Sequence, residues 1–159
     1  MVVQQNIAHG TTGFIAQNNG KGNFARIRRG FRTGFKMEVL YSIFVMLIVF
    51  FFSKELISLF LGDEGVAVVT EGVKYLKVMV FLYMLPGITN VIQGYFRGLG
   101  KMKITLNATF AQMLGRVISA YILAPYFGIE GIALACLVGW ICMLSYEYPL
   151  FNKAWRTVK

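Results

Sequence analysis

Four long apolar runs alternate with short polar segments along this chain. The runs cover residues 37–53, 78–96, 104–127 and 130–150. A helix rises about 1.5 Å per residue, so roughly 20 apolar residues cross a hydrocarbon layer of about 30 Å. The pattern therefore predicts an all-α fold, a polytopic membrane helix bundle with four transmembrane helices.

The segments outside these runs are polar or basic. Residues 1–20 are too polar to span alone and lack the features of a signal peptide, so we interpret them as the remnant of a preceding fifth helix. Residues 21–36 carry six basic side chains and no acid, which predicts a basic cytoplasmic loop that can lie on the membrane surface as an amphipathic helix. Residues 37–150 hold the four spans, and residues 151–159 form a basic cytoplasmic tail.

The turn between the second and third runs is basic and contains glycine. Gly98 and Gly100 allow the backbone to reverse sharply, and three cations between Arg97 and Lys103 keep the turn in water. The two runs and this turn therefore predict a transmembrane hairpin whose turn, residues 97–103, lies in the cytoplasm.

Composition and charge support a membrane protein over a soluble one. Hydrophobic residues make up 57% of the chain and charged residues 14%, which is too apolar for a soluble surface. The net charge of +9 comes from cations clustered between the spans, so it indicates loops facing an anionic leaflet and no nucleic-acid partner. Acids at Asp63, Glu64 and Glu130 lie in the alternate segments and belong outside. The chain is therefore expected to be a multi-pass protein of the plasma membrane.

Polar side chains share one face on the second and third spans. At 100° per residue, Tyr83, Asn90 and Gln93 fall within an arc of about 80° that also contains Pro86. Pro86 removes one helix hydrogen bond and is expected to kink the span. The third span carries a similar stripe, so the candidate cavity-lining residues are Tyr83, Asn90, Gln93, Thr109, Gln112 and Arg116.

Arg116 is the one charged residue inside the third run. By helical rise it lies roughly 20 Å from the inner edge of that run. An intramembrane charge usually faces the bundle interior or a water-filled cavity, but snorkelling or capping of carbonyls explains it equally well. For the uncharged polar residues, hydrogen bonding between helices without substrate contact is a further alternative.

Small residues mark where helices approach one another. Gly87 and Gly94 lie beside the polar face of the second span, and the fourth span repeats small residues at four-residue spacing. Such strips are typical of close helix packing in membranes. These small residues therefore indicate where helices pack and do not indicate a binding or catalytic site.

The residue sets of soluble enzymes are absent from the sequence. His9 is the single histidine, so the sequence offers no histidine cluster for a metal and no serine-histidine-aspartate set. Cys136 and Cys142 are interpreted as free thiols that pack as small hydrophobes. We therefore expect no enzyme activity, no bound metal and no cofactor.

The ordered segments resemble the multidrug and toxic compound extrusion (MATE) family. The resemblance rests on short pieces in the family's order and spacing: Gly13 to Asn23 with the basic run that follows, Leu59-Phe60-Leu61-Gly62, Tyr75-Leu76, Tyr95 to Lys101, Arg116 with Tyr121, and Gly128 to Ile132. It implies two six-helix lobes, with this chain forming the end of the second lobe. The missing first lobe of the same transporter would then be a partner, beside the lipid bilayer.

The resemblance also implies an activity. Family members export cationic or amphipathic compounds in exchange for protons or sodium ions, so coupling to one of these ions is expected. The resemblance does not assign a coupling site to residues of this sequence, because Glu38 and Glu147 lie near span ends and the second span has no acid. Two alternatives remain: a fragment of a related lipid-carrier flippase, and a small four-helix membrane protein with a structural role.

Overall fold

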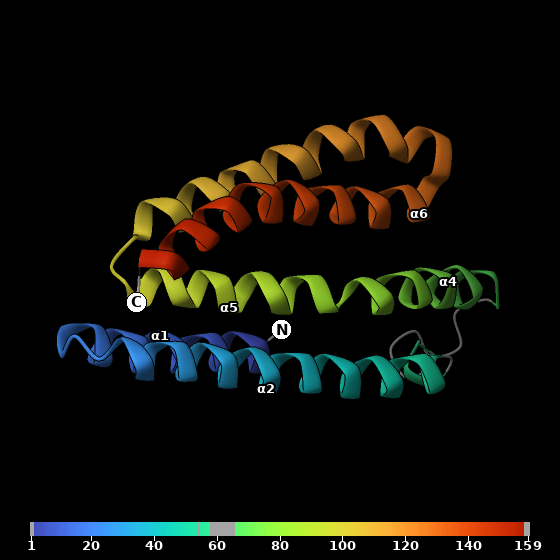
Figure 1. Ribbon diagram of the computed structural model, residues 1–159. Helices are drawn as coiled ribbons and strands as arrows, with labels where there is room; N and C mark the ends of the chain where they lie inside the picture. The colour runs from blue at the N-terminus through green and yellow to red at the C-terminus, as the bar shows by residue number, and fades with distance from the viewer. Residues whose placement is uncertain (1, 54, 58–65, 158–159) are drawn as a thin grey trace.

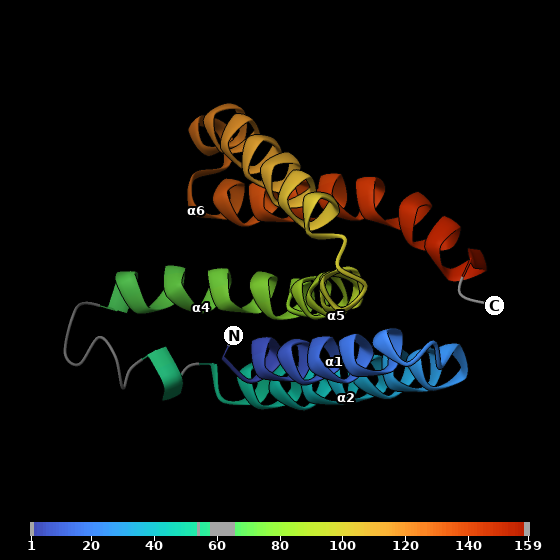
Figure 2. The ribbon, with the colours of Figure 1, turned by 90° about the vertical axis from the view of Figure 1, so that its left-hand side faces the viewer.

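Helices stack in three layers in the computed structural model, which describes residues 2–53, 55–57 and 66–157 (Figure 1). The order along the chain is α1 (Val2–Gly20), α2 (Phe24–Phe51), α4 (Val66–Leu82), α5 (Met84–Gly98) and α6 (Met102–Thr157). The pair α1 and α2 forms one layer, α4 and α5 the middle layer, and α6 folds back on itself as the third (Figure 2). Asp63, Glu64 and the Leu59-Phe60-Leu61-Gly62 piece lie outside the described residues.

Four membrane crossings fit this arrangement. By length and composition, the stretches Phe24–Phe51, Tyr75–Gly98 and Met102–Thr157 can each cross a membrane among the described residues. The third is long enough for two crossings and reverses at Gly128, where φ is 56° and ψ is −129°. A positive φ is strained for any residue with a side chain, which is why glycine occupies the reversal. The prediction of an all-α membrane helix bundle is confirmed.

The prediction of a loop over residues 21–36 needs correction. Helix α2 begins at Phe24 and continues without interruption into the span, so only residues 21–23 lie between helices. The Asn23 side chain caps the helix by accepting a hydrogen bond from the backbone N–H of Arg26 at 3.2 Å. Ile27 and Phe31 are buried against the bundle, and this burial keeps the basic segment in line with the rest of α2.

The basic tail is likewise helical as far as it is described. Helix α6 runs to Thr157, so residues 151–157 extend the fourth span and are not a separate tail. Trp155 anchors this end: its ring centroid lies 5.4 Å from that of Phe31 on α2 and 6.0 Å from that of Tyr95 on α5. Phe151 completes the cluster, 5.2 Å from Tyr95. Four aromatic rings therefore join α2, α5 and the end of α6 in one core.

The second span is divided into two helices. Helix α4 ends at Leu82 and α5 begins at Met84, with Tyr83 between them. Pro86 has no N–H to donate to the carbonyl of Leu82, four residues earlier, which explains a break at this point. The break lies in the middle layer, between α2 below and α6 above (Figure 1).

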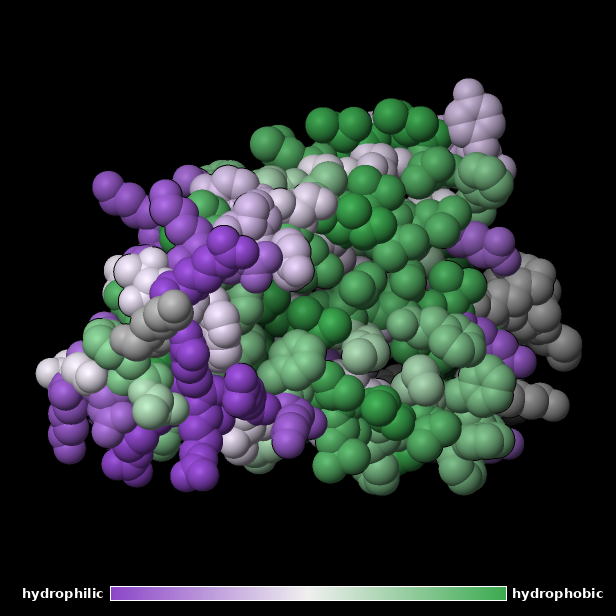
Figure 3. Space-filling view, viewed as in Figure 1, coloured by the Kyte–Doolittle hydropathy of each residue, from purple (hydrophilic) through white to green (hydrophobic). Residues whose placement is uncertain are grey.

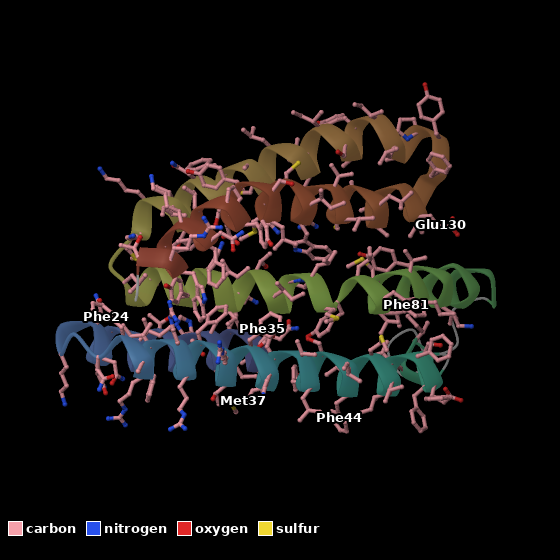
Figure 4. All side chains as sticks on the ribbon, in the orientation of Figure 1. Phe24, Phe35, Met37, Phe44, Phe81 and Glu130 are labelled. Carbon is pink, nitrogen blue, oxygen red and sulfur yellow. The ribbon has the colours of Figure 1, made fainter. Side chains whose placement is uncertain are left out.

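The surface is divided between an apolar region and a basic end. Hydrophobic side chains cover the larger part of the face in Figure 3, and hydrophilic ones gather where α1 meets α2 and where α6 ends. Met37 and Phe44 project outward from α2 (Figure 4) and are 53% and 60% exposed. Exposed apolar area of this extent is typical of a lipid-facing surface.

Candidate functional site

The polar faces of α5 and α6 meet at Gln93. Its side chain is buried, and its Nε2 donates to Thr109 Oγ1 at 3.4 Å and approaches Met143 Sδ at 4.0 Å. Thr109 lies on the first arm of α6 and Met143 on the second, so Gln93 contacts both arms. The structure thus brings together Gln93 and Thr109 from the predicted set.

A buried acid belongs to the same polar cluster. Glu147, on the second arm of α6, has an exposed fraction of 0%. Gln93 and Arg97 act electrostatically on its carboxyl group, although no described residue makes a hydrogen bond to either oxygen. Gln93, Arg97 and Glu147 thus place an amide, a guanidinium and a carboxyl group near one another in the bundle.

The other predicted residues do not join this cluster. Asn90 and Gln112 are half-buried, and Tyr83 is half-buried at the helix break. Arg116 is exposed on α6 and lines a hollow of about 480 Å³ with apolar residues, namely Val117, Ala120, Tyr121, Ala124, Pro125 and Ile132. The exposed Arg116 and the buried Gln93 therefore line different surfaces of this chain.

A second polar cluster surrounds the break between α4 and α5. The Nε2 of Gln4, from α1, donates to Ser42 Oγ at 3.2 Å and to the carbonyl oxygen of Tyr83 at 3.4 Å. Glu38 lies one turn from Ser42 on α2 and is 1% exposed. Two helices, α1 and α2, therefore direct polar side chains at the point where the middle layer is interrupted.

Sequence reasoning placed Glu38 and Glu147 at span ends and missed their burial. A usable signal is present in the periodicity. Glu38 belongs to the buried face of α2, which contains Ile27, Phe31, Gly34, Glu38 and Ser42. Glu147 falls on a comparable face of α6, four residues after Met143 and seven after Trp140. An acid in register with a buried face is expected to point inward.

The glycines of α5 set how closely the helices pack. A Cβ atom at Gly94 would lie 2.8 Å from the carbonyl oxygen of Ala8, and one at Gly98 would lie 2.7 Å from Ile15 Cβ. At Gly87 it would lie 2.9 Å from Glu38 Oε1. The predicted approach of other helices at Gly87 and Gly94 is therefore present, and both helices concerned belong to the first layer.

These features define a class of protein: a polytopic membrane helix bundle with a broken span and buried polar groups beside the break, as transporters have. The MatE family profile matches residues 1–122. The chain therefore belongs to the MatE family.

Comparison of folds agrees with the family assignment. The structure superposes with a TM-score of 0.84 on a solved chain described as the inward-facing conformation of a multidrug resistance MATE family transporter of the MOP superfamily, at 17% sequence identity. The match covers 95% of this chain and 35% of that transporter. No curated protein sequence matches the chain.

Proposed function

We propose that this chain is the end of the second lobe of a secondary active antiporter that exports cationic or amphipathic drugs in exchange for protons or sodium ions. The observation that carries the proposal is the shared fold, which extends over 95% of this chain and matches a solved chain described as a multidrug resistance MATE family transporter. The family match over residues 1–122 supports it independently.

The exposed polar face of α1 supports a contact with other helices of the same transporter. Gln5, Asn6, His9 and Gln17 are all exposed on this helix. Polar side chains in contact with hydrocarbon are costly, so such a face is expected to be covered by protein or to line water. We propose that the remaining helices of the transporter cover α1, and that the first lobe faces this one across the substrate cleft.

The basic end of the bundle supports an orientation. Arg97, Lys101 and Lys103 lie in or beside the turn between α5 and α6, and Arg26, Arg29 and Arg32 lie at the start of α2. The turn between α5 and α6 and the start of α2 lie at the end where hydrophilic side chains gather (Figures 1 and 3). Because cytoplasmic loops carry an excess of cations, we propose that this end faces the cytoplasm and that the protein resides in the plasma membrane.

Among the candidate residues, Gln93 is the best placed to respond to the transport cycle. It contacts both arms of α6 from α5, so a relative movement of these helices must change its hydrogen bonds. We propose that Tyr83, Asn90 and Gln112 contribute to the polar lining of the same lobe. Arg116 is assigned a structural or gating role, because a cation in the cleft would repel cationic drugs.

Transport measurements on the complete transporter that carries this chain test the proposal. In everted membrane vesicles, we expect uptake of a fluorescent cationic dye that stops when the proton and sodium gradients are both dissipated. The 159-residue chain alone is the matched control and is expected to give no uptake. Movement of a lipid-linked pyrophosphate, with no movement of the dye, would contradict the antiporter and support a flippase.

A further inference from the structure

A basic hollow of about 740 Å³ lies along the first turns of α2. Three of the cations that line it, Arg29, Arg32 and Lys36, are exposed. At 100° per residue they fall within an arc of about 60°. No described residue forms a hydrogen bond or an ion pair with their side chains, and the sequence contains no acid before Glu38. The hollow is therefore expected to attract an anion.

The two other cations of the hollow already contact the protein. Arg28 donates from Nη2 to the carbonyl oxygen of Trp155 at 3.1 Å, and its guanidinium carbon lies 5.3 Å from the centre of the Trp155 ring. The guanidinium carbon of Arg26 lies 5.9 Å from the centre of the Phe14 ring. Arg29, Arg32 and Lys36 are therefore the cations that a ligand in the hollow would meet.

An apolar groove adjoins this basic hollow. It has a volume of about 510 Å³, lies between α1 and α2, and shares Arg29 and Thr33 with the hollow. Ile7 and Phe14 line the groove from α1, and Met37 lines it from α2. A phosphate group and an acyl chain joined in one molecule would match this pair of surfaces, since one is cationic and the other apolar.

Glycines close the floor of the groove and leave its outer side open. A Cβ atom at Gly30 would overlap the Phe14 ring, and one at Gly34 would overlap Thr11 Oγ1, so α1 and α2 are in direct contact at these two positions. At Gly10, which also lines the groove, a Cβ atom would have nothing within 4 Å. The groove is therefore closed toward the bundle and accessible from outside it.

The groove continues into the lipid-facing surface of α2. Met37 lines it and is 53% exposed, and Leu40 and Phe44 extend the same face with 71% and 60% exposure (Figure 4). Figure 3 shows the hydrophilic side chains near the start of α2 directly beside the hydrophobic surface of its later turns. On α1, Ile7 and His9 are two residues apart and therefore point to nearly opposite sides. Helices that cover the polar face of α1 would thus leave the groove open to lipid.

We infer that the basic hollow and the apolar groove together bind one anionic phospholipid. Arg29, Arg32 and Lys36 hold its phosphate, for which guanidinium and ammonium groups are suited, and the groove between α1 and α2 holds part of an acyl chain. A free phosphate would leave the groove empty, and a zwitterionic lipid would bring its own cation among three others. That the lipid belongs to the inner leaflet rests on the proposed orientation. Binding depends neither on that orientation nor on transport.

Native mass spectrometry of the purified 159-residue chain, titrated with phosphatidylglycerol in detergent, tests the inference. Phosphatidylcholine with the same acyl chains is the probe for charge, and inorganic phosphate is the probe for the acyl chain. We expect phosphatidylglycerol to bind with a stoichiometry of one, and each of the other two probes to bind at least about tenfold more weakly.

Variants of the basic hollow test the phosphate contacts. Each cation near an anionic lipid contributes roughly fivefold to affinity, so the combined substitution Arg29→Gln, Arg32→Gln and Lys36→Gln is expected to weaken phosphatidylglycerol binding roughly 100-fold. These side chains are exposed, so their loss does not disturb the packing of the bundle. Lys101→Gln with Lys103→Gln is the matched control, because it removes exposed cations from the same end of the molecule outside the hollow.

A second pair of variants tests the acyl groove. Gly10→Leu places a side chain in the groove, and Gly13→Leu is its control, because Gly13 lies on the same helix with nothing within 4 Å and does not line the groove. Displacing two methylene groups of the acyl chain is expected to weaken binding of phosphatidylglycerol more than about tenfold in Gly10→Leu alone. Circular dichroism checks that the two variants have equal helical content.

Four results would overturn the inference. Equal binding of phosphatidylglycerol and phosphatidylcholine would exclude a charge-selective site, and equal binding of inorganic phosphate would show a simple anion site. Equal effects of the hollow or groove variants and their controls would show that lipid coats the chain without a defined site. Binding to the chain that is lost in the complete transporter would show that another helix, and not a lipid, occupies the groove.

Discussion

Replacing Gly98 by alanine tests the close approach of α5 to α1. The added Cβ would lie 2.7 Å from both Cβ and Cγ2 of Ile15 and 2.9 Å from the Thr12 carbonyl oxygen. The carbonyl is backbone and cannot rotate away, so the two helices must separate. Overpacking of this kind costs about 1–3 kcal/mol.

Gly13→Ala is the matched control, because it is also a helical glycine but has no atom within 4 Å of the added Cβ. Alanine is favoured over glycine in a helix interior by about 1 kcal/mol. Gly13 is interior to α1, whereas Gly98 is the last residue of α5, so Gly98→Ala gains only part of this term beside its steric cost. We expect Gly98→Ala to have a free energy of unfolding about 1–3 kcal/mol lower than that of Gly13→Ala.

Circular dichroism during titration with a denaturing detergent, in mixed micelles, measures this difference. Equal unfolding free energies for the two variants would refute the reasoning, because they would mean that α1 and α5 are not held at this separation. A further variant, Gly94→Ala, serves as a replicate, since its Cβ would lie 2.8 Å from the Ala8 carbonyl oxygen. Agreement between Gly94→Ala and Gly98→Ala would assign the effect to the helix interface.

Three further predictions concern the aromatic core, the orientation and Arg116. Phe31→Ala is expected to lower the free energy of unfolding by about 3–5 kcal/mol, whereas Phe44→Ala, on the outer face, changes it little in the same detergent titration. A Leu99→Cys variant should react with an impermeant maleimide only from the cytoplasmic side. Labelling of this variant in intact cells would show that the orientation is the reverse of the proposed one. Arg116→Ala in the complete transporter should lower abundance or turnover without changing drug preference; unchanged expression with a switch in substrate charge would contradict its structural role.

The spans could be predicted from the sequence because hydrophobic length is a property of consecutive residues. The reversal near Gly128, the hairpin turn after Arg97 and the glycine contacts of α5 follow from local chemistry in the same way. The continuity of residues 24–36 with the first span could not be predicted so directly. Its charges favour water, and only the burial of Ile27 and Phe31 against distant residues such as Tyr95 and Trp155 joins it to the span.

The helical angle of a polar residue does not by itself predict whether that residue is buried. Gln93 and Thr109 come into contact because the polar faces of α5 and α6 meet. Arg116 shares the angular face of Thr109 but is exposed on this chain, although its Cβ lies against the second arm of α6, 3.1 Å from where a Cβ at Gly139 would be. An angle on one helix identifies a face, but the neighbouring helices determine whether that face is interior.

The burial of Glu38 likewise depends on neighbouring helices and not on its position along the chain. A charge at the edge of an apolar run is normally expected to extend toward water, and its position beside Lys36 favoured that interpretation. In the structure Lys36 is exposed while Glu38, two residues later, turns about 200° around the helix and lies on the buried face. Burial of an acid among acceptors has no benefit for stability alone, because an apolar residue of similar size would avoid the cost of desolvation. Glu38 is therefore buried because it is in register with Phe31 and Ser42 on the inward face of α2, and not because an acid favours packing there.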